Sequence, residues 1–124
     1  MAFILIVDDS DDMAPLEIAL ASNGGPRVVV LTDGRLALKL LETDPPDLAA
    51  VITDLHLPFV NGFDLVAAIR AHDRFERLPV IVISGDNDPQ VQERVRGLGA
   101  NAFFAKPYSP AEIRQALGNL LYAV

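Results

Sequence analysis

The chain has no cysteine and no tryptophan, and its 10 Lys and Arg residues are outnumbered by 17 Asp and Glu residues. Without cysteine, a disulfide scaffold, a thiolate metal cage and a cysteine nucleophile are all excluded. Any metal ligands must therefore come from carboxylates and from the two histidines. The net charge of −7 repels phosphate backbones, so the composition argues against direct binding of nucleic acid.

Long hydrophobic runs are also missing. The first apolar stretch, Ala2 to Val7, has no basic flank and leads directly into Asp8 and Asp9, so it is too short for a signal peptide or a membrane span. These features predict a cytoplasmic protein that does not insert into a membrane. Cations and basic protein surfaces are the partners that its charge favours.

What is present fits one globular domain. A chain of 124 residues buries roughly two-thirds of its surface on folding, and a hydrophobic fraction of 51% is far from the disordered range. Five apolar runs rich in β-branched residues lack the polar alternation of a half-exposed sheet, so they are typical of parallel strands covered on both faces. These runs are Phe3–Val7, Arg27–Leu31, Leu48–Thr53, Val80–Ser84 and Ala102–Ala105.

Segments with helical spacing separate these runs and predict a helix after each strand. Their apolar positions are Met13, Leu16 and Leu20; Leu36, Leu40 and Leu41; Phe63, Val66 and Ile69; Val91, Val95 and Leu98; and Ile113, Leu117, Leu120 and Leu121. Because a proline is tolerated only in the first helical turn, Pro15 predicts that the first helix begins near Asp11 or Asp12. Together the segments predict an α/β domain of the (βα)5 type, with a doubly wound parallel sheet of five strands.

Polar side chains stand where four of the predicted strands end. Asp8 and Asp9 follow the first strand, Asp54 the third and Lys106 the fifth, and Ser84 ends the fourth. Right-handed crossovers bring the carboxyl ends of parallel strands to one edge of the sheet, so we expect these groups in one cleft. A divalent cation such as Mg²⁺ relieves the repulsion among crowded carboxylates and accepts phosphate oxygens as further ligands.

This set of groups is typical of phosphoryl transfer. A carboxylate can act as the nucleophile when a metal ion and a fixed cation neutralise the charge on the transferring oxygens. Asp54 would be the nucleophile, Lys106 the cation and Ser84 a hydrogen-bond donor. The ammonium of Lys106 stands out because Lys39 is the only other lysine, and a compact ammonium suits a point contact with a phosphoryl oxygen.

At these positions the sequence resembles the receiver domains of two-component response regulators, over essentially the whole chain. The resemblance rests on landmarks that occur in the order and spacing of the family: Ile4-Leu5-Ile6-Val7-Asp8-Asp9, Asp33-Gly34, Asp54-Leu55-His56-Leu57-Pro58 with Gly62, Ser84-Gly85, Gly99-Ala100, and Phe103 leading to Lys106-Pro107. It implies a CheY-like, flavodoxin-like fold with strand order 2-1-3-4-5. It also implies a single receiver domain over residues 1–124, with no output domain in this chain.

The resemblance assigns the catalytic and metal-binding roles residue by residue. Asp54 matches the phosphorylated aspartate, and Lys106 matches the invariant lysine of the family. Asp8 and Asp9 match the acidic pair that holds Mg²⁺, or Mn²⁺ in its place, together with Asp54 and the backbone carbonyl of His56.

It also assigns the switch and tuning roles. Ser84 and Phe103 match the hydroxyl and the aromatic residue that rearrange when the phosphoryl group arrives. The Lys106–Pro107 peptide bond is expected to be cis, a conformation that is common only before proline. His56 and Asp86 occupy positions that vary in the family and tune the lifetime of the phosphoryl group.

Two phenylalanines follow each other in the predicted fifth strand. Because strand residues alternate between faces, we expect one of Phe103 and Phe104 to face the core and the other a surface. The resemblance selects Phe103 as the switch residue.

The implied function is a switch that phosphorylation controls. A phosphohistidine on a sensor histidine kinase or a histidine phosphotransfer protein donates to Asp54, and the new charge alters a distant surface. That surface comprises the helix with Val91, Val95 and Leu98, the strand Ala102–Ala105 and the helix that begins at Pro110. An unidentified downstream protein or a missing output domain reads it, and it is a candidate surface for homodimer formation. The chain would be a signalling module and not an enzyme, because it catalyses only its own phosphorylation and dephosphorylation.

Three other readings compete with this one. A pseudo-receiver that only binds partners usually lacks part of the acidic or lysine set, whereas this chain keeps every member. A haloacid-dehalogenase-like phosphatase also uses an aspartate nucleophile with Mg²⁺, and Asp9-Ser10-Asp11 faintly matches its first motif, but Met13 replaces the threonine that follows there. An FMN carrier with the flavodoxin topology would place a phosphate at residues 8–12, where the carboxylates repel it.

Overall fold

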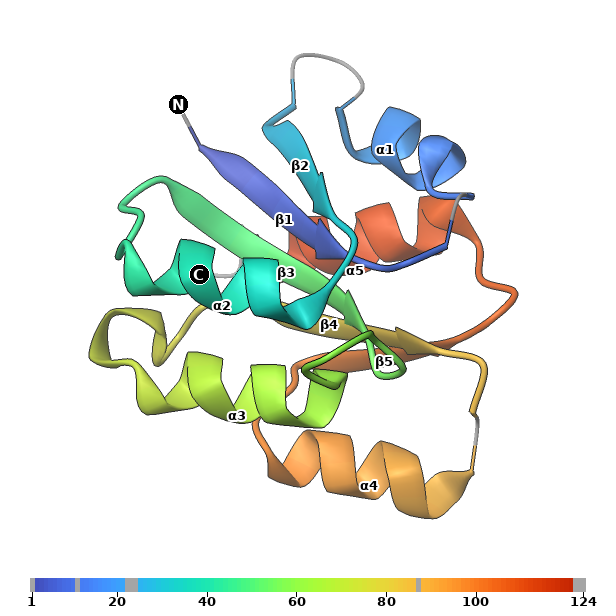
Figure 1. Ribbon diagram of the computed structural model, residues 1–124. Helices are drawn as coiled ribbons and strands as arrows, with labels where there is room; N and C mark the ends of the chain where they lie inside the picture. The colour runs from blue at the N-terminus through green and yellow to red at the C-terminus, as the bar shows by residue number, and fades with distance from the viewer. Residues whose placement is uncertain (1, 11, 22–24, 87, 122–124) are drawn as a thin grey trace.

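Five strands pair in one parallel sheet with the order β2-β1-β3-β4-β5, which confirms the predicted topology (Figure 1). The computed structural model describes residues 2–10, 12–21, 25–86 and 88–121. The strands are β1 (Phe3–Val7), β2 (Arg27–Leu31), β3 (Leu48–Asp54), β4 (Val80–Ser84) and β5 (Ala102–Ala105). Their bounds match the predicted apolar runs, except that β3 continues to Asp54.

Helices cover both faces of this sheet (Figure 1). One face carries α1 (Ala14–Ala21) and α5 (Pro110–Leu121), and the other carries α2 (Gly34–Glu42), α3 (Gly62–Ala71), the short 3-10 helix η2 (Asp73–Phe75) and α4 (Pro89–Gly97). A sheet covered in this way has no wet face, which explains why the apolar runs show no polar alternation.

Successive strand residues pack into two separate cores. Leu5 of β1 lies in the core beneath α2, α3 and α4, whereas its neighbour Ile4 lies in the core beneath α1 and α5. The edge strand β5 alternates in the same way, so Phe103 packs on the first core and Phe104 on the second. Both rings are half-buried. The prediction that one of them faces a surface is therefore wrong, because helices cover both faces of this strand.

Helix α1 begins later than predicted. It starts at Ala14, so Pro15 is its second residue, where the missing N–H costs no helix hydrogen bond. In the preceding turn the backbone N–H of Asp12 donates to Ser10 Oγ at 3.2 Å. The other predicted starting residue, Asp11, lies outside the described residues.

Side-chain caps fix the starts of α3 and α4, the helices that follow β3 and β4. Asn61 Oδ1 accepts from the N–H of Asp64 at the start of α3, at 2.9 Å. Asp88 caps α4 in the same manner through the N–H of Gln90. These caps satisfy backbone donors that a helix leaves open at its first turn. Among the described helices, none combines the length and the apolar content that a bilayer span requires.

Candidate functional site

Three carboxylates meet at the edge of the sheet where β1 and β3 end. Asp8 and Asp9 directly follow β1, and Asp54 is the last residue of β3, which pairs with β1. Ligand oxygens from the three side chains all lie within 4.8 Å of one another. Asp8 and Asp54 are 0% and 5% exposed, whereas Asp9 is exposed. The structure thus brings together the three acidic residues that the strand ends predicted.

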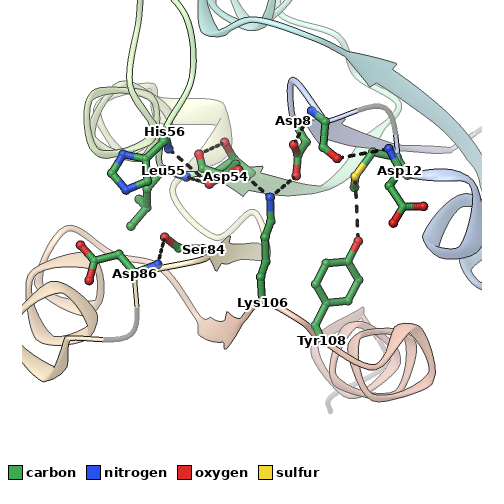
Figure 2. A network of polar contacts seen from close by, with 12 residues as sticks. Asp8, Asp12, Asp54, Leu55, His56, Ser84, Asp86, Lys106 and Tyr108 are labelled. Carbon is green, nitrogen blue, oxygen red and sulfur yellow. Dashed lines mark hydrogen bonds and ion pairs between the residues drawn. The ribbon is translucent and has the colours of Figure 1, made fainter.

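Lys106 reaches the two buried carboxylates from the end of β5 (Figure 2). Its Nζ donates to Asp54 Oδ2 at 2.7 Å and to Asp8 Oδ2 at 3.0 Å. The peptide bond between Lys106 and Pro107 is cis, as the resemblance implied. In their ordinary charged forms, the three carboxylates and this ammonium carry a net charge of −2.

Backbone N–H groups fix the other oxygen of each buried carboxylate. Asp54 Oδ1 accepts from the N–H of Leu55 at 2.6 Å and from that of His56 at 3.2 Å. Asp8 Oδ1 accepts from the N–H of Ser10 at 2.8 Å. Each of these carboxylates therefore has one oxygen held by backbone and one held by Lys106, which leaves its side chain little freedom to rotate.

Gly62 explains why the chain after Asp54 returns so closely to the strand end. A Cβ at this position would lie 2.2 Å from the carbonyl oxygen of Asp54 and 2.6 Å from the Cα of Leu55. The N–H of Gly62 also donates to the carbonyl of Leu55 at 2.8 Å. A glycine is needed here because no side chain fits between the start of α3 and the backbone of Asp54.

Ser84 ends β4 beside Asp54 and is fully buried. Its Oγ accepts from the N–H of Asp86 at 3.0 Å, and its carbonyl accepts from the N–H of Lys106 at 2.8 Å. Asp86 and His56 are both exposed, and in the view of Figure 2 both lie to the left of Asp54, on the side away from Asp8. The hydroxyl thus lies at the predicted edge of the sheet, where it accepts a hydrogen bond from the backbone N–H of Asp86.

The pKa of Lys106 reflects opposing effects. Burial alone would lower its pKa, but the hydrogen bonds to Asp54 and Asp8 and their negative charges outweigh the burial and raise it. The ammonium therefore stays charged at neutral pH, as a fixed counter-charge for the two carboxylates.

A cleft of about 580 Å³ opens next to Lys106, and spacing arguments did not predict it. Its walls are the segments that lead into α1 and α5 together with the first turns of these helices, and they are lined by Ser10, Asp12, Met13, Pro15, Lys106, Pro107, Tyr108 and Pro110. The hydroxyl of Tyr108 lies 3.9 Å from Met13 Sδ, across 95 positions of sequence. Burial, with the negative charge of Asp8 second, raises the pKa of Tyr108. A contact this distant in the chain leaves no periodic signal, which is why Tyr108 was not a candidate.

The donor set fits a hard divalent cation. Asp8, Asp9 and Asp54 offer carboxylate oxygens close together, and Lys106 offsets only one of their three negative charges. Such oxygens are the ligands that Mg²⁺ and Mn²⁺ prefer, and a bound cation would offset the repulsion among them. A phosphoryl oxygen that enters this site would meet the same cation and the ammonium.

Comparison with known proteins assigns this arrangement to a class. The family model of the response regulator receiver domain matches residues 4–118. A two-component response regulator of Oryza sativa subsp. japonica is 30% identical over 96% of this chain and 56% of its own length. The sensor histidine kinase TmoS of Ectopseudomonas mendocina is 33% identical over 95% of this chain, but over 12% of its own length.

A solved structure agrees with these relatives. The chemotaxis response regulator CheY4 of Vibrio cholerae superposes with a TM-score of 0.81 at 26% identity, covering 98% of this chain and 99% of that one. The chain therefore belongs to the response regulator receiver domain family of two-component systems. It spans about half the length of the rice regulator and a small part of the kinase.

Proposed function

We propose that Asp54 accepts a phosphoryl group and that this modification switches the surface of the domain. The observation that carries the proposal is that both carboxylate oxygens of Asp54 accept hydrogen bonds. Two backbone N–H groups donate to Oδ1, and Lys106 donates to Oδ2. A carboxylate held in this way is oriented for attack before any donor arrives. This preorganisation lowers the activation free energy of phosphoryl transfer, because orienting the reacting groups accounts for a large part of such barriers.

The donor is a phosphohistidine on a sensor histidine kinase or on a histidine phosphotransfer protein. A carboxylate oxygen of Asp54 forms a bond to phosphorus while the bond from phosphorus to the imidazole nitrogen breaks, and the imidazole leaves with the electron pair and takes up a proton. Lys106 neutralises charge on the phosphoryl oxygens, and the Ser84 hydroxyl turns from Asp86 to donate to one of them.

Mg²⁺ is the proposed metal, with Mn²⁺ as the alternative. Asp8, Asp9 and Asp54 would hold it, together with the backbone carbonyl of His56, and when bound it would neutralise charge on the transferring group. Hydrolysis of the aspartyl phosphate resets the domain, at a rate that His56 and Asp86 tune from their exposed positions beside the site.

The output of the switch is a change in the surface formed by α4, β5 and α5. Phe103 connects this surface to the site because it lies on β5 and packs on the core beneath α4. A downstream protein or an output domain would read the surface, or a second copy would bind it. The domain acts in the cytoplasm as a signalling module, and its chemistry serves only its own modification.

The proposal is tested by intact-mass analysis after incubation with phosphoramidate and Mg²⁺. We expect the native chain to gain the mass of one phosphoryl group and Asp54→Asn to gain none. Asp64→Asn, which changes an exposed aspartate of α3, is the control for the loss of one charge and should gain the group as the native chain does. An unmodified native chain under conditions that label another receiver would leave the pseudo-receiver reading.

A further inference from the structure

Helices α3 and α4 lie side by side on one face of the sheet (Figure 1). Two arginines link them: Arg70 of α3 contacts the segment after α4, and Arg94 of α4 contacts α3. Arg70 in the last turn of α3 reaches the segment that follows α4. Its Nε donates to the carbonyl of Gly99 at 2.9 Å, and its Nη1 donates to the carbonyl of Phe75 at 2.9 Å. Its Nη2 donates to Asn101 Oδ1 at 3.0 Å. One guanidinium thus ties three segments together.

Gly99 lets the backbone after α4 lie flat against this arginine. Its φ of 110° belongs to the region that favours glycine, and a Cβ would lie 2.8 Å from Cγ of Arg70. Asn101 extends the connection, because its Oδ1 also accepts from the N–H of Val80 at 2.8 Å. The end of α4 is therefore linked through Arg70 to the first residue of β4.

The second arginine runs in the opposite direction. Arg94 of α4 places its guanidinium 4.0 Å from the ring centre of Phe63 in α3, a cation–π contact. The next residue, Val95, is the buried residue of α4. Arg94, Val95 and Gly99 together hold the C-terminal half of the helix.

The N-terminal half of α4 is held differently. Asp88, Pro89 and Gln90 are exposed, and the cap from Asp88 to the N–H of Gln90 stays within that turn. Val91 is half-buried. This half follows Ser84 through the segment with Gly85 and Asp86, so a change at Ser84 reaches it first.

We propose that Arg70 and Arg94 form a clamp that makes the C-terminal end of α4 a fixed pivot. The phosphorylation signal then tilts the N-terminal half of the helix about this end and does not shift the helix as a whole. Arg70 and Arg94 are positioning residues, because neither contacts the carboxylates. The inference rests on the proposed function, since that function supplies the change at Ser84.

The test follows three methyl-bearing residues along the helix by NMR. Val91 and Val95 lie on successive turns of α4, Leu98 directly follows its last residue, and each is at least half-buried. Spectra of the native chain are compared before and after loading with beryllofluoride, which mimics the phosphoryl group, in the presence of Mg²⁺. We expect the methyl signals of Val91 to shift, and those of Val95 and Leu98 to shift much less.

Two variants release the clamp. Arg70→Lys keeps the charge but loses the fork that serves three acceptors, and Arg94→Gln removes the cation–π contact at an exposed position where folding is not at risk. In both we expect the Leu98 methyl shift on loading to approach that of Val91. Arg96→Gln makes the same charge change at an exposed residue of α4 and should behave as the native chain. Without loading, the amides of Gly99 and Ala100 should exchange about tenfold faster in Arg70→Lys.

The ¹⁹F signal of bound beryllofluoride separates the two claims. If that signal is present and all three methyl groups shift equally in the native chain, the pivot is wrong while the proposed function stands. If the ¹⁹F signal is absent, the proposed function fails, and amide exchange in Arg70→Lys at the native rate would remove the clamp as well. Unchanged methyl patterns in both variants would also overturn the clamp.

Discussion

Gly62 and Lys106 show how single residues shape the site around its two buried carboxylates, Asp8 and Asp54. A Cβ at Gly62 would lie 2.2 Å from the carbonyl oxygen of Asp54, so the start of α3 can approach the end of β3 only because this residue is glycine. Lys106 supplies the charge that two buried carboxylates need. Removing one partner of such a group costs stability because it leaves buried charge without compensation.

Gly62→Ala is expected to lower the free energy of unfolding by about 2 kcal/mol or more, because the backbone of Asp54 must move to admit the methyl group. The phosphorylation rate of Gly62→Ala should also fall. Gly118→Ala is the matched control, since nothing lies within 4 Å of a Cβ at this helical position. The control should raise stability by about 0.5 to 1 kcal/mol. Urea unfolding measures both, and equal effects of the two changes would refute the close approach at Gly62.

The raised pKa values of Lys106 and Tyr108 predict a loss of stability in alkali. A lysine whose pKa is raised from 10.5 stabilises the folded chain fully below that value and ceases to do so as pH rises through the raised pKa. A tyrosine whose pKa is raised from 10.0 loses its proton first in the unfolded chain, which also favours unfolding at high pH.

Between about pH 9 and about pH 12, the native chain should therefore lose more stability than the double variant Lys106→Gln/Tyr108→Phe. Chemical unfolding at each pH gives the two slopes. Parallel slopes would show that neither group is perturbed as described.

Secondary-structure elements differ in how well the sequence predicts them. The strand bounds agree with the predicted ones because a short continuous apolar run is typical of a parallel strand that helices cover on both faces. The buried faces of the helices follow the sequence less closely: Leu36, one of the apolar positions with helical spacing, is 41% exposed, and Ala37 lies in the buried face of α2. Small residues give little periodic signal, so Ala37 could not be recognised from spacing.

The alternation of β5 bears on the proposed switch. Phe103 packs on the core beneath α4, and Phe104 packs on the opposite core. We expect Phe103→Ala to leave phosphorylation by phosphoramidate intact and to reduce the methyl shift of Val91 on loading. Phe104→Ala makes the same truncation on the other face and should preserve the shift. Equal loss of phosphorylation and of the shift in Phe103→Ala would argue against a switch role.

At the scale of the whole molecule, topology explains why the candidate site was predictable and the clamp was not. The order β2-β1-β3-β4-β5 brings strand ends together, so residues that follow apolar runs converge whatever their separation in the sequence. Arg70 and Gly99 are 29 positions apart and follow no such rule, since their contact depends on how two helices pack. The net charge of −7 also gains a location, because part of it lies in the three clustered carboxylates.

Location of the phosphoryl group within the chain tests the central claim most directly. After incubation with phosphoramidate and Mg²⁺, borohydride reduction converts an aspartyl phosphate to homoserine, which peptide mass spectrometry assigns to one residue. The account predicts conversion at Asp54 alone, and its loss when Mg²⁺ is chelated. Conversion at Asp8 or Asp9, or equal conversion with and without the metal, would contradict it.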